Sequence, residues 1–309
     1  MGDAVDESAL FAPISHTADG RLSVRLPANH PGFHDPDYRR RRDVIATLAS
    51  QHRPGDPPPI VSYTDEEHEV WRLVCDELRP RRQRWVCQEL KDAAEELDLP
   101  TDHIPQLTEA NATLRRLNGF GFAPAAGMVP VTHFFGAFAE HLFYSTQYIR
   151  HHSVPLYTPE PDVVHEVAGH GIHLASPRLA RVYEAVGQAV ARVRTDDAVR
   201  LISRVFWFTC EYGVVREQGQ VKAYGAGLLS SFGEMEQMSD AEIRELDLAS
   251  IVRHGTYDVA TYQPVLYAGR SMDHVIDFCL DFFSRANDET PASLGARAAG
   301  AASPGRPRT

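Results

Sequence analysis

The amino-acid sequence predicts a mainly α-helical domain with a few short β-strands. Helix start signals recur along the chain, as at Asp35, which is followed by a proline in the first helical position. Apolar residues follow these signals at helical spacing, for example over 70–78. The β-like segments, such as 221–224, are short and lie between expected helices.

Four helices are expected in the first 120 residues. Thr64 and Glu67 have the spacing of a capping box, in which each side chain hydrogen-bonds the other residue's backbone. Asn118 followed by Gly119 is a common signal for a helix C-terminus. The expected helices cover 36–51, 65–78, 86–97 and 108–117.

Three further helices are expected after residue 175. Ser176 precedes a proline and Thr195 precedes two aspartates, and both patterns are typical of helix N-termini. The helix that starts at Thr195 should run towards Glu211. The segment SMDHVIDFCLDFFS, 271–284, has amphipathic helical spacing and should close the domain.

We interpret residues 25–286 as one domain, because no repeat and no linker rich in Gly and Ser interrupts them. Residues 1–24 lack helical or strand periodicity and are expected to form a flexible N-terminal arm. Residues 287–309 are rich in Ala, Gly, Pro and Arg, which predicts a disordered tail.

Charge and composition exclude several classes of partner. The 309 residues carry a formal net charge of -11, so neither nucleic acid nor an anionic membrane surface is an expected partner. No apolar run approaches the roughly 20 residues of a membrane span. The four cysteines form no C-x-x-C motif, which favours reduced thiols and a cytoplasmic location.

The segment YTPEPDVVHEVAGHGIHLAS, 157–176, carries two histidines five residues apart, His165 and His170. The H-E-x-x-H signature of zinc proteases needs a spacing of four. Five residues of regular helix turn two side chains about 140° apart, so both can bind one ion only where the helix ends, widens or kinks. Gly169 and Gly171 flank His170 and permit such a break. We therefore expect the pair to hold a metal from a helix end.

Glu211 is the best candidate for a third ligand, because it is an acid within the apolar, aromatic segment FWFTCEYG. A buried carboxylate needs a partner, and a metal ion is a suitable one. Two histidines and one carboxylate with open positions are typical of non-haem iron(II) oxygenases. The alternatives are structural histidines and a Glu211–arginine pair. His173 is a competing ligand that we place behind the ligands or at the surface.

Several longer segments resemble the aromatic amino acid hydroxylases, which depend on Fe(II), a tetrahydropterin and O2. These segments are HPGFHDPDYRRRR, DHIPQL, STQYIRHHSVPLYTPEPD, FWFTCEYG, KAYGAGLLSSFGE and YQPVLY. The resemblance covers nearly the whole expected domain, and it implies the catalytic-domain fold of that family, a helical basket. It also implies that His165, His170 and Glu211 bind the iron. The family's long regulatory domain and tetramerising helix have no counterpart here, so a monomer or weak dimer is expected.

The resemblance also implies a pocket for an aromatic amino acid. Arg150 would hold the carboxylate of the amino acid, a task that suits a planar bidentate donor. Trp207 would pack against the substrate's ring, and Ser230 would close the pocket and hydrogen-bond a ligating histidine. The other residues implied in this pocket are Tyr157, Thr158, Pro159, Glu160, Pro161 and Gly227.

A pterin site is implied next to this pocket. Phe134 would stack on the pterin, which would be tetrahydrobiopterin or a related compound, and Glu166 would face it through water. The other residues implied in cofactor binding are Gly127, Met128, Val129 and Phe206.

The expected reaction is ring hydroxylation of free L-phenylalanine to tyrosine. Hydroxylation at the meta position and hydroxylation of tryptophan are the alternatives, and a zinc hydrolase is a remote one that Gly169 opposes. Phe206 and Ile172 stand where the family usually has Tyr and Pro. Together with Cys210 and Trp207, these residues are expected to influence the substrate and the ring position. Trp207 favours phenylalanine or tyrosine over tryptophan.

Overall fold

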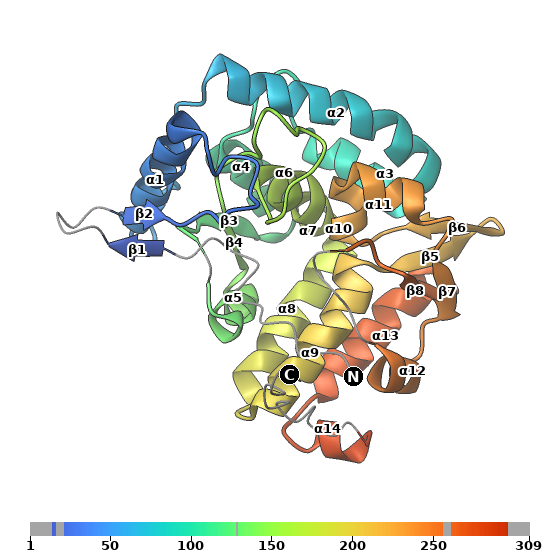
Figure 1. The fold of residues 1–309 in the computed structure, drawn as a ribbon. Coiled ribbons are helices and arrows are strands. Elements are labelled where there is room, and N and C mark those ends of the chain that lie inside the picture. The colour runs from blue at the N-terminus through green and yellow to red at the C-terminus, as the bar shows by residue number, and fades with distance from the viewer. Residues whose placement is uncertain (1–13, 17–21, 128, 256–260, 296–309) are drawn as a thin grey trace, which may run out of the picture.

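The computed structural model describes residues 14–16, 22–127, 129–255 and 261–295, and helices dominate it (Figure 1). The first half contains α1 (Pro36–Ser50), α2 (Asp65–Trp85), α3 (Gln88–Leu97), α4 (Leu107–Asn118), α5 (Val131–Ala137) and the 3-10 turn η2 (Phe138–Glu140). The second half contains α6 (Val163–His165), the π-helical turn η3 (Glu166–His170), α7 (Gly171–Ala175), α8 (Pro177–Arg192), α9 (Asp196–Phe206), a second π-helical turn η4 (Trp207–Glu211), α10 (Ala226–Ser230), α11 (Phe232–Gln237), α12 (Leu248–His254), α13 (Met272–Arg285) and α14 (Thr290–Ser293). The predicted fold class is confirmed.

The predicted helix starts are formed by the expected side chains. The Asp35 carboxylate accepts two backbone N–H groups in the first turn of α1. Thr64 and Glu67 form the capping box at the start of α2. Helix α3 begins two residues later than predicted, because Val86 is extended and bridges Ala223. The helices therefore follow the capping chemistry of the sequence, except where a strand contact competes.

The strands are short and form three small sheets. They are β1 (Ile14–His16), β2 (Leu22–Val24), β3 (Gly121–Pro124), β4 (Leu142–Ser145), β5 (Val214–Glu217), β6 (Gln220–Ala223), β7 (Glu242–Glu245) and β8 (Val265–Gly269). Strands β1 and β2 form an antiparallel pair, and β3 and β4 form a parallel pair. The third sheet has the order β6-β5-β8-β7, in which β8 runs parallel to both of its neighbours.

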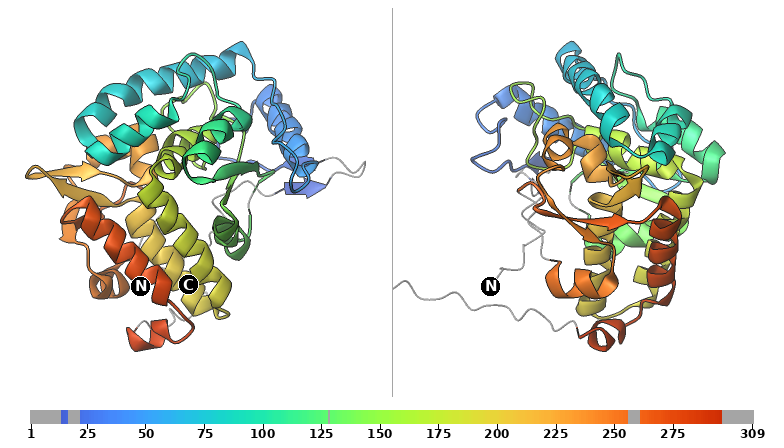
Figure 2. Two further views of the ribbon diagram at one scale, coloured as in Figure 1. Left: turned by 180° about the vertical axis from the view of Figure 1, so that it is seen from behind. Right: turned by 90° about the vertical axis from the view of Figure 1, so that its right-hand side faces the viewer.

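The segment formed by α6, η3 and α7 lies in the middle of the molecule. Helices α3 and α4 pack against α7, and α10 packs against η3 (Figure 1). Helix α8 continues from α7 and packs against α13, as the view from behind shows (Figure 2). No helix in the part of the chain that the structure describes is long and apolar enough to cross a membrane.

Folded structure extends beyond the expected domain limits of 25 and 286. Strands β1 and β2 lie within the predicted arm, and the Leu22 and Val24 side chains of β2 are buried. Helix α14 lies within the predicted tail, and the Asp288 carboxylate accepts the backbone N–H groups of Arg194 and Thr195. The rest of both segments, 1–13, 17–21 and 296–309, lies outside the described residues.

Candidate metal centre

The three side chains expected to bind a metal converge in the structure. His165 ends α6, His170 ends η3, and Glu211 ends η4. The Nε2 atom of His170 lies 3.1 Å from Nε2 of His165 and 3.0 Å from Oε1 of Glu211. Nε2 of His165 lies 3.7 Å from Oε2 of Glu211. These atoms are close enough to hold one ion.

The helix that carries both histidines widens between them. In the π-helical turn η3, the backbone N–H of Gly171 donates to the carbonyl of Glu166, five residues earlier. Such a turn brings residues five apart onto one face, as a regular helix does for residues four apart. His165 and His170 therefore reach the same point, and the helix continues as α7. Our expectation of a helix end at this pair was wrong, because widening alone removes the mismatch.

The geometry and protonation of the three groups fit a divalent metal ion. An octahedral ion with bonds of about 2.1 Å places neighbouring ligand atoms about 3.0 Å apart. Burial lowers the pKa of His165 to about 4 and that of His170 to about 3, so both rings are neutral and offer a lone pair. Burial also raises the pKa of the Glu211 carboxyl. A bound cation would offset the cost of this buried charge.

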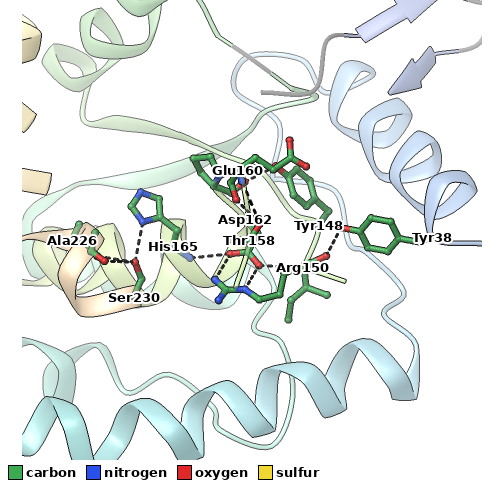
Figure 3. A network of polar contacts seen from close by, with 12 residues as sticks. Tyr38, Tyr148, Arg150, Thr158, Glu160, Asp162, His165, Ala226 and Ser230 are labelled. Carbon is green, nitrogen blue, oxygen red and sulfur yellow. Dashed lines mark hydrogen bonds and ion pairs between the residues drawn. The ribbon is translucent and has the colours of Figure 1, made fainter. Parts of the chain in front are cut away.

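Ser230 orients the first ligand, as predicted. Its hydroxyl donates to the carbonyl of Ala226 at 2.8 Å, so its oxygen accepts from Nδ1 of His165 at 2.9 Å (Figure 3). This contact leaves the lone pair of the His165 ring on Nε2, the atom that faces the other ligands. The close approach of α10 requires glycine at position 169, where a Cβ would lie 2.8 Å from the Ala226 carbonyl oxygen.

Arg150 is buried and held by Asp162. Its Nε and Nη2 atoms donate to the two carboxylate oxygens at 2.9 and 2.8 Å, and its backbone N–H donates to the same carboxylate (Figure 3). Asp162 also caps α6 by accepting the backbone N–H of His165. One carboxylate thus fixes the arginine and the helix that carries the first ligand. The pairing of Arg150 with Asp162 was not anticipated.

Glu160 braces the loop before α6 against α1. Its carboxylate lies 2.5 Å from Nη1 of Arg42 and 3.4 Å from Nε2 of His30, and all three side chains are buried. The Arg42 guanidinium also lies 3.3 Å from the centroid of the Tyr148 ring, and the Tyr148 hydroxyl donates to the carbonyl of Pro161. The Glu160 carboxylate therefore has a structural role, and we no longer expect it to contact a substrate.

The other predicted residues of this loop surround Glu160. The Thr158 hydroxyl donates to the Glu160 carbonyl at 2.7 Å, which closes a tight turn around Pro159. Tyr157 is 53% exposed, so its ring is accessible to a bound molecule.

Trp207 stands at the start of the second widened turn. The backbone N–H of Tyr212 donates to its carbonyl at 2.9 Å, five residues earlier, and this turn presents Glu211. The Trp207 indole donates to the Gln263 side chain and lies 4.7 Å from the Tyr212 ring. A Cβ at position 227 would lie 2.8 Å from that ring, so glycine lets α10 pack against this turn.

Aromatic rings connect the predicted pterin site with the metal ligands. The half-buried Phe134 ring of α5 lies 5.2 Å from Phe143, which lies 4.7 Å from His170. Gly127 and Val129 are half-buried in the preceding loop, and Met128 lies outside the described residues. The sequence-predicted loop and ring thus lie on one side of His170.

Glu166 and Phe206 are buried beside the ligands. Burial, together with Glu211 and Asp162, holds the pKa of the Glu166 carboxyl well above its usual value. Phe206, which was also predicted to take part in cofactor binding, lies nearly parallel to the His170 imidazole, with ring centroids 6.4 Å apart. Phe206 therefore forms part of the aromatic surroundings of His170.

The two residues expected to control specificity are both buried. Ile172 lines a cavity on the side of α7 that faces α2 and α3. Cys210 contacts Thr209, and burial, with Cys279 nearby, raises the pKa of its thiol. Cys210 lies three residues after Trp207, but the spacing of a regular helix does not place the two side chains on one face, because 207–211 is a π-helical turn. An effect of these residues on specificity would pass through the backbone beside the ligands.

His173 lies behind the ligands and is fully buried, which confirms one of its two predicted positions. Its imidazole hydrogen-bonds the carbonyl of Tyr224 and the hydroxyl of Tyr183. The Tyr183 hydroxyl also lies 2.7 Å from Nδ1 of His170. Tyr183 was not anticipated. The signal that could have found it is a tyrosine on the aliphatic, buried face of α8.

Comparisons with known proteins identify the family of the chain. Residues 18–289 match the family model of biopterin-dependent aromatic amino acid hydroxylases. A phenylalanine 3-hydroxylase from Streptomyces coeruleorubidus is 44% identical over 265 residues, which cover 86% of this chain and 95% of that protein. A chloroplastic phenylalanine 4-monooxygenase from Physcomitrium patens is also 44% identical, over 69% of this chain. This chain spans only 54% of the moss protein's length.

The fold is also that of solved phenylalanine hydroxylases. The cobalt-bound enzyme from Chromobacterium violaceum superimposes with a TM-score of 0.71 at 25% identity, over 82% of this chain and 93% of that one. A structure of the same bacterial enzyme holds iron(III) and 7,8-dihydrobiopterin, and at 24% identity it supports the fold alone.

Proposed function

Because the chain belongs to the family of biopterin-dependent aromatic amino acid hydroxylases, we propose that it hydroxylates the ring of free L-phenylalanine. The convergence of His165, His170 and Glu211 carries this proposal. Two imidazoles and one carboxylate leave open positions on an iron(II) ion, as in non-haem oxygenases. The bound iron, with a tetrahydropterin as electron donor and O2 as co-substrate, supplies the oxidising chemistry.

Arg150 binds the carboxylate of the amino acid in this proposal. Asp162 engages Nε and Nη2 of the guanidinium, which fixes its plane and leaves Nη1 for an incoming anion. The substrate's ring then extends towards Trp207 and the open side of the ligands. The pocket residues assigned to the substrate are Tyr157, Thr158, Pro159, Pro161, Gly227 and Ser230.

The pterin binds against α5 and its preceding loop. The half-buried Phe134 ring offers a stacking face, and backbone groups of 127–129 hydrogen-bond the edge of the pterin. Glu166 faces the pterin, and burial, together with Glu211 and Asp162, holds the pKa of its carboxyl well above the usual value. The two organic molecules thus approach the metal from different sides.

We propose the meta position of the ring as the site of hydroxylation. The Streptomyces phenylalanine 3-hydroxylase supports this choice, because the similarity extends over 95% of that protein. The Physcomitrium patens phenylalanine 4-monooxygenase has the same percentage identity and favours the para position, but its match covers a shorter part of this chain. The para product remains the second candidate.

Product analysis tests the proposal. Protein loaded with Fe(II) would be incubated with a tetrahydropterin, O2 and each of phenylalanine, tyrosine and tryptophan. We expect meta-tyrosine from phenylalanine, identified by chromatography against both authentic tyrosines. The control is Glu211→Gln, which keeps the shape of the side chain and removes the anionic ligand. Para-tyrosine as the product would reject the ring position, and turnover of none of the three amino acids would reject the function.

We also propose a binding partner, an oligomeric state and a cellular location for the protein. The expected partner is a free aromatic amino acid. A monomer or weak dimer and a cytoplasmic location remain predictions. Light scattering at several protein concentrations would test the assembly, and a tetramer would contradict it.

A further inference from the structure

Two buried polar side chains behind His170 have no part in the site as proposed so far. The Tyr183 hydroxyl of α8 lies 2.7 Å from Nδ1 of His170 and 3.2 Å from Nδ1 of His173. Nε2 of His173 in turn hydrogen-bonds the backbone carbonyl of Tyr224. The Tyr183 and His173 side chains are completely buried. They form a chain of three hydrogen bonds that ends at a metal ligand.

The Tyr224 carbonyl at the end of this chain determines which atom donates in each of the three hydrogen bonds. The Tyr224 carbonyl can only accept, so Nε2 of His173 carries a proton. Nδ1 of a neutral His173 then has a lone pair, so the Tyr183 hydroxyl donates to it. The Tyr183 oxygen is left to accept from Nδ1 of His170. The proton of His170 therefore sits on Nδ1, and the lone pair on Nε2 faces Glu211 and His165.

Within the described residues, the surroundings of His170 offer no other hydrogen-bond partner for Nδ1 that would fix this tautomer. The rings of Phe143 and Phe206 lie beside the imidazole, with centroids 4.7 and 6.4 Å away, and neither has a polar atom. Among the described residues, Tyr183 is the hydrogen-bond partner of Nδ1. Without its hydroxyl, a proton on Nδ1 would be buried and unpaired. The proton would then favour Nε2, where it can donate to Glu211 and where it prevents metal binding.

We propose that Tyr183 and His173 act as positioning residues that fix the tautomer and orientation of His170 and thereby set the metal affinity of the site. This inference rests on the proposed metal centre. The hydrogen-bond chain from His173 through Tyr183 to His170 resembles the contact of Ser230 with His165. In both, a hydroxyl oxygen accepts the Nδ1 proton of a proposed ligand. Groups that orient metal-bound histidines in this way typically change metal affinity by about 10- to 100-fold.

The test measures metal binding by the whole protein, without turnover. Apo protein is titrated with Co(II), and the visible absorption of the bound ion reports both affinity and coordination. We expect Tyr183→Phe to lower the affinity by about 10- to 100-fold and to change the absorption spectrum. The control is Tyr267→Phe, which removes the hydroxyl of another fully buried tyrosine, one that donates to the carbonyl of Ser250. It should bind Co(II) as the wild type does.

A pair of substitutions at His173 gives a second, independent arm. His173→Leu leaves the Tyr183 hydroxyl without its acceptor and should also weaken Co(II) binding. His173→Gln keeps one acceptor and one donor in the side chain and should restore most of the affinity. If Tyr183→Phe does not fold, this pair still decides the question.

The experiment distinguishes failure of the proposed metal centre from failure of the proposed role of Tyr183 and His173. If His165→Ala and Glu211→Gln bind Co(II) as tightly as the wild type, the metal centre itself is wrong. If these variants lose the metal but Tyr183→Phe and Tyr267→Phe bind Co(II) with the same affinity and the same spectrum, the proposed role of Tyr183 and His173 is overturned. Equal affinities of His173→Leu and His173→Gln would overturn it as well.

Discussion

At the residue scale, the proposal has the Arg150 guanidinium bind two anions, the Asp162 carboxylate and the carboxylate of the substrate. Asp162 takes two of its N–H groups, and the proposed substrate takes others. We predict that Arg150→Lys lowers kcat/KM for the free amino acid by roughly 2–5 kcal/mol of transition-state stabilisation, because lysine cannot serve both anions. Steady-state kinetics with phenylalanine measure this loss.

A substrate without a carboxylate separates binding from a general loss of structure. The wild type should prefer phenylalanine strongly over phenethylamine, and Arg150→Lys should lose most of this preference. If the variant loses activity towards both compounds by the same factor, Arg150 does not hold the substrate's carboxylate.

Glu234 predicts a dependence of stability on pH. Burial raises the pKa of its carboxyl from 4.5 to about 7, although the backbone N–H of Gln263 opposes this shift. The folded state therefore keeps a proton that the unfolded state releases from about pH 4.5 upwards. The contribution of Glu234 to stability is fully present below pH 4.5 and is lost as the pH rises through about 7.

We therefore expect Glu234→Gln to be more stable than the wild type above pH 7 and equally stable below pH 4.5. Denaturant unfolding curves across this range measure the difference. Glu236→Gln, on the exposed side of the same helix, controls for the loss of one charge. A constant difference between Glu234→Gln and the wild type at all pH values would contradict the prediction.

At the element scale, the sequence predicted helix starts better than helix interiors. Asp35 and Thr64 cap α1 and α2 as expected, since capping depends on a few neighbouring residues. Of the two widened turns, the one at 166–170 was anticipated only as one of three ways to bring His165 and His170 together, and the one at 207–211 was not predicted. Their backbone pattern depends on tertiary packing, including the hydrogen bond from Arg82 to the carbonyl of Ala168. A single sequence contains no local signal of such a contact.

The brace between α1 and the substrate loop can be tested as an element. Arg42 and Glu160 form a buried ion pair that joins residues 118 positions apart. We predict that Arg42→Leu and Glu160→Leu each cost about 3–5 kcal/mol of unfolding free energy, because each removes the nearest ionic partner of a buried charge. The double variant should lose less than the sum of the two.

Arg40→Leu is the matched control for this cycle. It removes an exposed ion pair with Asp37 on the same helix, and surface pairs contribute little to stability. If Glu160→Leu raises KM for phenylalanine without any loss of stability, Glu160 contacts the substrate and the brace is wrong.

At the scale of the whole molecule, the fold assembles one site from segments that are far apart in the sequence. The candidate ligands His165, His170 and Glu211 could be proposed from the sequence, because their residue types and flanking motifs are local. The supporting contacts were not, because Asp162, Tyr183 and Arg42 each bond partners brought close only by folding. The sequence therefore indicates the chemistry, and the structure explains how it is held in place.

Metal binding should consequently stabilise the whole fold. An ion held by His165, His170 and Glu211 would join η3 to η4 and would bind only where both are in place, so it would favour the native state by mass action. At a free metal concentration of 100 times Kd, this linkage contributes about 2.7 kcal/mol. We predict that removing the metal with a chelator lowers the Tm of the wild type by a few degrees. Glu211→Gln without metal should be at least as stable as the metal-free wild type, since a buried charge is removed. Scanning calorimetry with and without Co(II) measures both effects. A wild-type Tm that does not respond to metal, or an equal response in Glu211→Gln, would mean that the three side chains do not share an ion.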